Sequence, residues 1–201
     1  MIWSITPLRR MMILFETDVF YDSDCLSCFL AVRECGILQK LFYKIIVPAV
    51  VAHEILKKGT PQHIKDNFND LVKLDFVEVR GMEVGSSEHE LFNDIKRDYE
   101  FMGDGEAAVI ALTQENGGVI ASNNLRDVKD YVEDYDLNLI TTAFILAIAY
   151  ENHLKTKEEL DKIWKDMINN GRKRSLPRNV NSFTQYYDEL YLDDMLFMGL
   201  N

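Results

Sequence analysis

The stretch Gly103-Asp104-Gly105-Glu106-Ala107-Ala108-Val109-Ile110-Ala111-Leu112 places two carboxylates at the start of an otherwise apolar helix. Gly103 and Gly105 frame the acids, and glycine lets a backbone turn tightly and approach a ligand closely. Asp104 suits the N-cap position, so that Glu106 falls in the first helical turn. Acids at a helix start often serve only to cap it. The stretch therefore indicates a functional site only if other polar groups gather beside it.

Such groups follow apolar segments elsewhere in the chain. Asp22, Glu54 and Asn123 each come shortly after a short run of β-forming residues. Strand-like and helix-like segments alternate here, which is typical of a parallel sheet covered by helices on both faces. Ligands of such sheets bind beyond the carboxyl ends of the strands. We therefore expect an α/β fold in which these polar residues converge on one edge of the sheet.

Local patterns predict several further elements. The segments 11–15 and 19–21 are rich in β-formers, and the apolar residues from Leu26 onward suit one side of a helix. Ser87 and Glu90 have the spacing of a capping box at the start of a polar helix. Another helix is expected around residues 128–132. Beyond about Thr156 the pattern becomes helical only, which predicts a main domain over residues 1–155 and a C-terminal helical extension over 156–201.

The bulk composition limits the class of protein. The 201 residues are 47% hydrophobic, but the longest apolar run, 143–150, is far shorter than the roughly 20 residues that span a bilayer. Three cysteines form no even disulfide framework, which indicates a reducing, cytoplasmic setting. Cys25 and Cys28 are expected to be buried core thiols. No membrane partner is predicted.

The formal net charge of -11 argues against a nucleic-acid binder that works through broad basic coverage. It does not argue against a nuclease, because an enzyme that collects carboxylates around a metal is acidic at its site. The candidate oxygen ligands, in chain order, are Asp22 with Asp24, Glu54, Asp104 with Glu106, and the amides of Asn123 and Asn124. Mg²⁺ and Mn²⁺ prefer such ligands and need only a few carboxylates.

Three stretches resemble the motifs of one family, in the family's order. Asp22-Ser23-Asp24-Cys25-Leu26 resembles the first, and Ile45-Ile46-Val47-Pro48-Ala49-Val50-Val51-Ala52-His53-Glu54 resembles the second, with its acid 32 positions after the first acid. The third is Gly105 to Leu112. A poorer match to the first motif is Glu16-Thr17-Asp18-Val19-Phe20. Over roughly residues 13–151 the chain is thus similar to PIN-domain proteins, metal-dependent nucleases that include many bacterial toxin ribonucleases.

The resemblance implies a three-layer α/β/α fold with a central parallel sheet. It also implies phosphodiester hydrolysis, with Asp22, Glu54 and Glu106 holding one or two divalent ions. Where the family usually has a fourth acid, this chain has Asn123, whose amide oxygen can bind a metal but carries no charge. We expect Asp127, one helical turn further on, to supply that charge. The auxiliary candidates are Asp24, Asp104 and Asn124.

Basic residues are candidates for contacts with phosphate groups. Arg126 lies close to the fourth position, and the one basic run of the chain lies in the C-terminal extension. The candidates in that run are Arg172, Lys173, Arg174 and Arg178, provided that the extension folds back over the site. A solvated loop is the alternative for this run. The resemblance further implies RNA rather than DNA as the nucleic acid, an antitoxin partner and a homodimer.

Two alternatives remain open. Asp22-Ser23-Asp24 also resembles the nucleophile motif of haloacid-dehalogenase phosphatases, in which the first aspartate is phosphorylated. The segment 103–105 mimics their late metal motif, but this interpretation leaves Glu54 without a role. The second alternative is a PIN-like module that binds RNA or a protein without cutting, and Asn123 is the feature that favours it.

Overall fold

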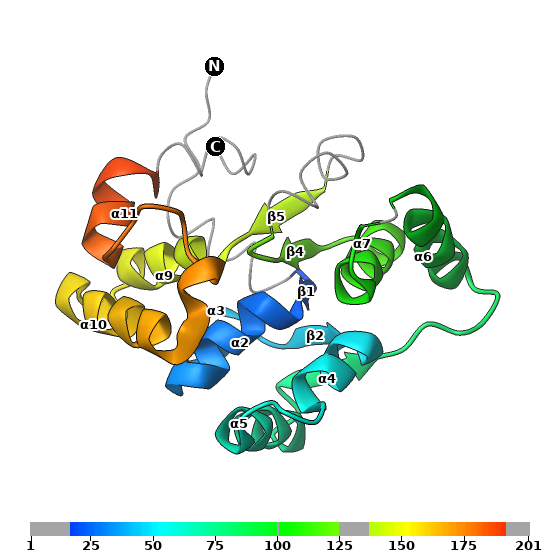
Figure 1. Ribbon diagram of the computed structural model, residues 1–201, viewed down its shortest axis with the longest axis horizontal. Coiled ribbons are helices and arrows are strands. Elements are labelled where there is room, and N and C mark those ends of the chain that lie inside the picture. The colour runs from blue at the N-terminus through cyan, green and yellow to red at the C-terminus, as the bar shows by residue number, and fades with distance from the viewer. Residues whose placement is uncertain (1–16, 100, 125–136, 192–201) are drawn as a thin grey trace.

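The computed structural model describes residues 17–99, 101–124 and 137–191 (Figure 1). Its strands form one parallel sheet in the order β3-β2-β1-β4-β5. They are β1 (Val19–Tyr21), β2 (Ile45–Pro48), β3 (Val77–Arg80), β4 (Val119–Ala121) and β5 (Asn138–Ile140). The expected strand 11–15 and the expected helix around 128–132 lie outside the described residues. The predicted parallel sheet is confirmed.

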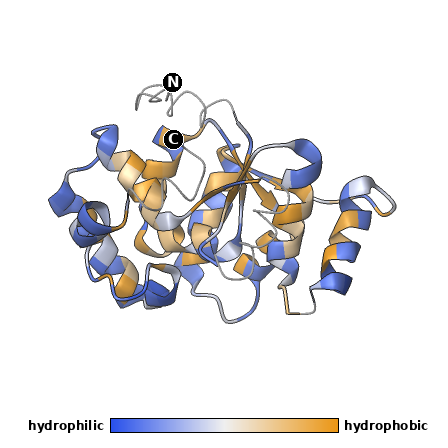
Figure 2. Cartoon of the chain, turned by 90° about the horizontal axis from the view of Figure 1, so that it is seen from above, coloured by the Kyte–Doolittle hydropathy of each residue, from blue (hydrophilic) through white to orange (hydrophobic). Residues whose placement is uncertain are grey.

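The middle strands are short and entirely apolar. Every residue of β1, β2 and β4 is buried, as expected of a parallel sheet whose two faces are both covered. Phe20 of the central strand pairs with Ile46 on one side and with Ile120 on the other. Figure 2 shows these hydrophobic strands between flanking helices. The sheet is therefore the centre of the core.

Helices lie on both sides of the sheet. They are α2 (Ser23–Val32), α3 (Cys35–Leu41), α4 (Ala49–Leu56), α5 (Gln62–Lys73), α6 (Ser87–Asp98), α7 (Asp104–Asn116), α9 (Thr142–Glu151), α10 (Lys157–Met167) and α11 (Phe183–Glu189). On one side, α7 packs over β1, β2 and β4, with α6 outside it (Figure 1). On the other side lie α2, α9, α10 and α11. This arrangement is the expected three-layer α/β/α fold.

The C-terminal helices pack directly on the rest of the domain. One face of α10 is buried, and this helix contacts both α2 and α11. Trp164 of α10 stacks on Tyr186 of α11 with 5.8 Å between ring centroids. The helical character predicted beyond Thr156 is thus confirmed, whereas the domain boundary at residue 155 stays a prediction. No helix of the described chain is long and apolar enough to cross a membrane.

Two helix starts differ from the sequence prediction. The helix α2 begins at Ser23, because the Asp22 side chain accepts a hydrogen bond from the Ser23 amide at 2.6 Å. Seven of its ten residues are buried, including Cys25 and Cys28, so that it has no single apolar side. In α6 the N-cap is Ser86 rather than Ser87, since the Ser86 hydroxyl accepts from the amide of residue 89 at 3.3 Å.

A glycine sets the register between β1 and β4. Gly118 has φ +128°, and a Cβ atom there would lie 2.5 Å from the carbonyl oxygen of Asp18. This close approach lets the Val119 amide donate to that same oxygen at 2.9 Å. At the other end of the pair, the Asp22 amide donates to the Ala121 oxygen at 2.9 Å. The residues that follow β1 and β4 are thereby held side by side.

Candidate functional site

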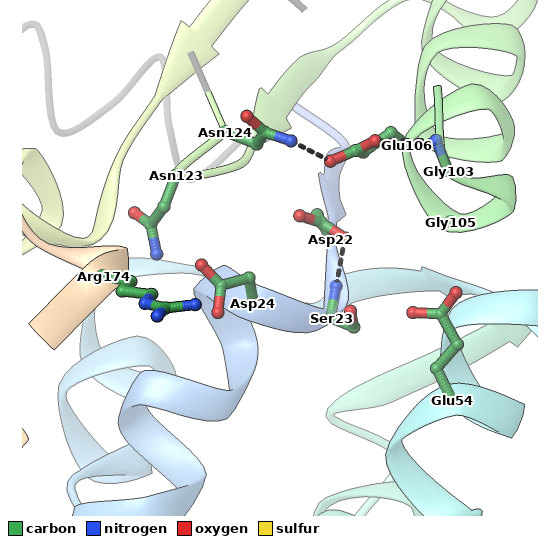
Figure 3. Close-up of a pocket in the computed structure, with 10 residues that line it drawn as sticks. All are labelled: Asp22, Ser23, Asp24, Glu54, Gly103, Gly105, Glu106, Asn123, Asn124 and Arg174. Carbon is green, nitrogen blue, oxygen red and sulfur yellow. Dashed lines mark hydrogen bonds between the residues drawn. The ribbon is translucent and has the colours of Figure 1, made fainter. Parts of the chain in front are cut away.

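A cavity of about 350 Å³ opens at the carboxyl ends of β1, β2 and β4 (Figure 3). It is lined by Asp22, Ser23, Asp24, Glu54, Gly103, Gly105, Glu106, Asn123, Asn124 and Arg174. Four of these residues are carboxylates, and one is an arginine. The structure thus brings together the acids of the three sequence motifs, which come from separate strand and helix units.

Asp22 is the most buried of the four acids, with 4% of its surface exposed. One carboxylate oxygen accepts from the Ser23 amide, and the other accepts from the Ser122 hydroxyl at 3.2 Å. Burial, followed by the negative charges of Glu106 and Asp24, raises the pKa of Asp22 to about 7. Ser122 was not among the predicted site residues, and only its place at the end of an apolar run pointed to it.

Glu54 reaches the cavity from α4. The buried residues of this helix are Val51, Ala52 and Ile55, and they face the core. A Cβ atom on Gly105 would lie 3.3 Å from each carboxylate oxygen of Glu54 and 3.2 Å from a methyl group of Val51. Glycine at position 105 therefore lets the Glu54 carboxylate lie directly against the first turn of α7. The close approach of these glycines to a ligand, which the sequence suggested, stays a prediction.

Glu106 lies in the first turn of α7 and is held from two sides. One carboxylate oxygen accepts from the Gly103 amide at 2.9 Å, and the other accepts from the side-chain amide of Asn124. The N-cap of α7 is Gly103 rather than Asp104, because Glu106 itself satisfies the amide at the helix start. Asp104 instead pairs with Lys96 at 3.0 Å, is 65% exposed and does not line the cavity.

Asn123 lines the cavity, but its amide is bound to α9. The Thr142 amide donates to the Asn123 carbonyl oxygen at 2.9 Å, and the Asn123 amide group donates to the Thr142 hydroxyl at the same distance. A backbone N–H can only donate, so the carbonyl oxygen of Asn123 must face the helix. The amide that contacts a carboxylate of the cavity is therefore that of Asn124. Thr142, which is fully buried, was not predicted as a site residue.

The C-terminal extension folds back over the site, as the interpretation of its basic run required. A kinked segment, Ile168–Arg172, leads into a short 3₁₀ turn, Lys173–Ser175. The buried Ser175 hydroxyl donates to the Asp24 carboxylate at 2.8 Å, which fastens this turn to the start of α2. Arg174 consequently lines the cavity opposite Glu54 and Glu106 (Figure 3).

The other predicted phosphate contacts lie elsewhere. Lys173 and Arg178 are exposed and do not line this cavity. Arg172 lines a neighbouring cavity. Arg126 and the predicted metal ligand Asp127 lie outside the described residues.

The donor set suits a hard divalent cation. Among the described residues, no three His, Cys, Asp or Glu side chains are gathered closely enough to form a complete metal site. Nevertheless, four carboxylates line one cavity, and the pKa of Asp22 is raised partly because its charged neighbours repel it. A divalent cation among these oxygen atoms would offset that repulsion, and Mg²⁺ or Mn²⁺ fits such ligands.

The family match agrees with this geometry. A family model described as a PIN domain (DUF3368) matches residues 18–189. The chain belongs to the PIN-domain family. PIN domains are generally metal-dependent nucleases, and the matched segment contains every residue that lines the cavity. No curated protein and no solved structure was found to match the chain.

The family assignment also bears on the phosphatase alternative. The matched PIN domain extends across all three motifs and through the helices beyond residue 155. Glu54, for which the phosphatase interpretation had no role, lines the PIN-domain cavity together with Asp22. The PIN-domain interpretation therefore accounts for an acid that the phosphatase interpretation leaves without a role.

Proposed function

We propose that this PIN-domain protein is a divalent-metal-dependent nuclease that hydrolyses phosphodiester bonds in RNA. The convergence of Asp22, Glu54 and Glu106 on one cavity carries the proposal. Asp22 is almost completely buried, and within the described residues it forms no ion pair. A carboxylate so placed is costly to ionise unless a ligand brings positive charge. A metal-binding role accounts for that cost, whereas helix capping alone does not require three acids at one place.

In this proposal Asp22, Glu54 and Glu106 hold Mg²⁺ or Mn²⁺. The chemistry that such an ion would supply there is a lowered pKa of a bound water molecule and compensation of charge on the phosphate. The Ser23 amide and the Ser122 hydroxyl fix both oxygen atoms of Asp22 by donating hydrogen bonds to them. Because these donors are neutral, they orient the carboxylate while leaving its negative charge uncompensated. That charge is then available to the metal.

Two further residues orient the other components of the site. The amide of Asn124 and the backbone amide of Gly103 fix the carboxylate of Glu106. Arg174, on the opposite wall, supplies a guanidinium group that can donate two hydrogen bonds to a phosphate. The substrate phosphate would therefore lie between Arg174 and the acids.

The biological role is proposed on the resemblance to toxin ribonucleases. It comprises RNA as the substrate, a role as the toxin of a toxin–antitoxin pair, an antitoxin partner and a homodimer. The three free, buried cysteines support the cytoplasmic setting that we propose for it.

A second candidate function is binding of RNA or a protein without cleavage. The observation that favours it is the contact between Asn123 and Thr142. The residue at the fourth position carries no charge, and its carbonyl oxygen already accepts a backbone hydrogen bond. The three acids would then have to hold the metal with less help than in a site with four carboxylates.

Cleavage of labelled single-stranded RNA and DNA, with Mg²⁺ or Mn²⁺, separates the two candidates. We expect metal-dependent cutting of RNA that falls by about 100-fold or more in Asp22→Asn and in Glu106→Gln, because each change removes a charged ligand. Asp104→Asn is the matched control, since it removes an acid that directly precedes the third motif and does not line the cavity. If the wild-type protein does not cut RNA, yet binds it equally well with and without metal, this result supports the binding module.

A further inference from the structure

A second cavity lies against the first. Its volume is about 320 Å³, and it shares Ser23, Asp24 and Glu54 with the carboxylate cavity. It extends away from the sheet edge, between α2 and the end of α4. Its remaining wall includes Lys57, which follows α4, and Arg172, which ends the kinked segment. Two cations from different parts of the chain therefore face one cavity.

Neither cation is neutralised within the described part of the chain. Lys57 is exposed, and neither it nor Arg172 forms an ion pair there. The Nε atom of Arg172 is buried without a hydrogen-bond partner. Because this atom is inaccessible, a ligand in the cavity would meet the guanidinium through its positive charge and its other N–H groups, and no carboxylate of the described chain lies within ion-pair distance to offset that charge. Arg172 thus indicates a ligand with acceptor oxygen atoms.

The two acids of the shared wall, Asp24 and Glu54, form no ion pair with these cations in the described part of the chain. Asp24 directs one carboxylate oxygen to the Ser175 hydroxyl at 2.8 Å, and Glu54 lies against Gly105 on the side of the first cavity. Both acids line both cavities, but among the described residues neither lies within ion-pair distance of either cation. Thr60 adds a hydroxyl group to the lining beside Lys57. Two cations and a hydroxyl are the groups that commonly bind a backbone phosphate.

We propose that this second cavity binds the phosphate next to the scissile one, so that the protein takes a single strand with consecutive phosphates rather than a mononucleotide. This inference rests on the proposed function of the first cavity. Only three side chains separate the two cavities, so that one extended strand passes from one to the other. The hydrogen bond from Ser175 to Asp24 holds the C-terminal segment so that Arg172 and Arg174 lie in neighbouring cavities along that path.

The affinity of a fluorescent single-stranded RNA oligonucleotide, measured by anisotropy, tests the inference. Ca²⁺ replaces Mg²⁺ so that the carboxylates have a cation, and a gel afterwards shows that the strand is intact. We expect Lys57→Gln and Arg172→Gln each to weaken binding about tenfold. Each change should also reduce the slope of log affinity against log salt concentration by about 0.7, the value for one phosphate contact on a single strand.

Lys58→Gln and Lys165→Gln are matched controls, because both are exposed lysines of the described chain that line neither cavity. We expect the controls to keep the wild-type affinity and slope. Since Arg172 is half-buried, thermal unfolding checks its variant, and the exposed Lys57 decides the matter if Arg172→Gln does not fold. A mononucleotide and inorganic phosphate serve as competing probes with a single phosphate.

Each outcome bears on one proposal. If both variants bind the oligonucleotide as tightly as the controls do, the second phosphate site is overturned. The proposed nuclease activity would still stand if metal-dependent cleavage is observed and is lost in Asp22→Asn. If the natural protein does not cut, but the two variants still lose oligonucleotide affinity, the second site stands and the nuclease fails. An equal loss for the mononucleotide overturns the inference, because the cavity would then bind the first phosphate.

Discussion

The polar groups on the two sides of the carboxylate cavity have different kinds of hydrogen-bond partner. The carboxylate side consists of Asp22, Glu54 and Glu106, and the paired side consists of Asp24 with Ser175 and Asn123 with Thr142. On the carboxylate side, neutral donors orient the acids without cancelling their charge. On the paired side, hydrogen bonds join segments that lie far apart in the chain. The first side is therefore arranged for a cationic ligand, whereas the second holds the fold together around it.

The largest expected effect comes from Asp22 on the carboxylate side. Its pKa rises from 3.8 to about 7 on folding, chiefly through burial. The stability that such a raised pKa contributes is fully present below about pH 4 and is lost as the pH rises through about 7. We therefore expect Asp22→Asn to make the metal-free protein more stable at pH 8, by roughly 4 kcal/mol at most, and by much less at pH 4. Urea unfolding at both pH values measures this difference.

The measured quantity is the difference between the two proteins, because every other titrating group is common to both. Saturating Mg²⁺ should stabilise the wild type at pH 8, by about 2.7 kcal/mol at a concentration 100 times the dissociation constant, and should have little effect on Asp22→Asn. A variant that is no more stable than the wild type at pH 8 would show that the burial of Asp22 carries no such cost.

On the paired side we expect Thr142→Val to destabilise the protein by about 2 kcal/mol, independently of metal. Valine keeps the shape of the buried side chain but removes the hydroxyl that accepts from Asn123. Thr142→Ser is the matched control, because serine retains that hydroxyl. Urea unfolding of the two variants compares them. Equal stabilities of the valine and serine variants would mean that packing of the methyl group, and not the hydrogen bond, matters at this position.

Much of the fold was predictable from local sequence. The short apolar runs that became β1, β2 and β4 are buried on both faces, and such strands show as continuous β-forming residues. The alternation with helices then fixed a parallel sheet. Helix starts were less predictable, because in α7 the carboxylate of Glu106 replaces an N-cap side chain at Gly103. That choice depends on tertiary placement rather than on the local propensity of Asp104.

How far the site residues could be predicted from the sequence also differs between the two sides of the cavity. The acids of the carboxylate side were predictable, since each follows a strand whose carboxyl end lies at the same edge of the sheet. The hydroxyl partners of the acids were not predictable on either side, because Ser175 meets Asp24 across 151 positions on the paired side and Ser122 meets Asp22 across 100 on the carboxylate side. Hydroxyl groups of this kind are common in loops and carry no pattern. Only the packed chain shows which of them meet.

The smallest effect is expected for Asp104, the acid that directly precedes the third motif and belongs to neither side of the cavity. Within the described chain it pairs with Lys96 at 3.0 Å, and its carboxylate is 65% exposed, so that water and salt screen the ion pair. We expect Asp104→Asn to change the free energy of unfolding by less than about 0.5 kcal/mol. Metal-dependent cleavage should stay within about twofold of the wild type, because exposed charges beyond the cavity are screened over about 8 Å. A large loss of cleavage with unchanged stability would place Asp104 among the acids that serve the metal, and the carboxylate side would then extend beyond the three residues that define it.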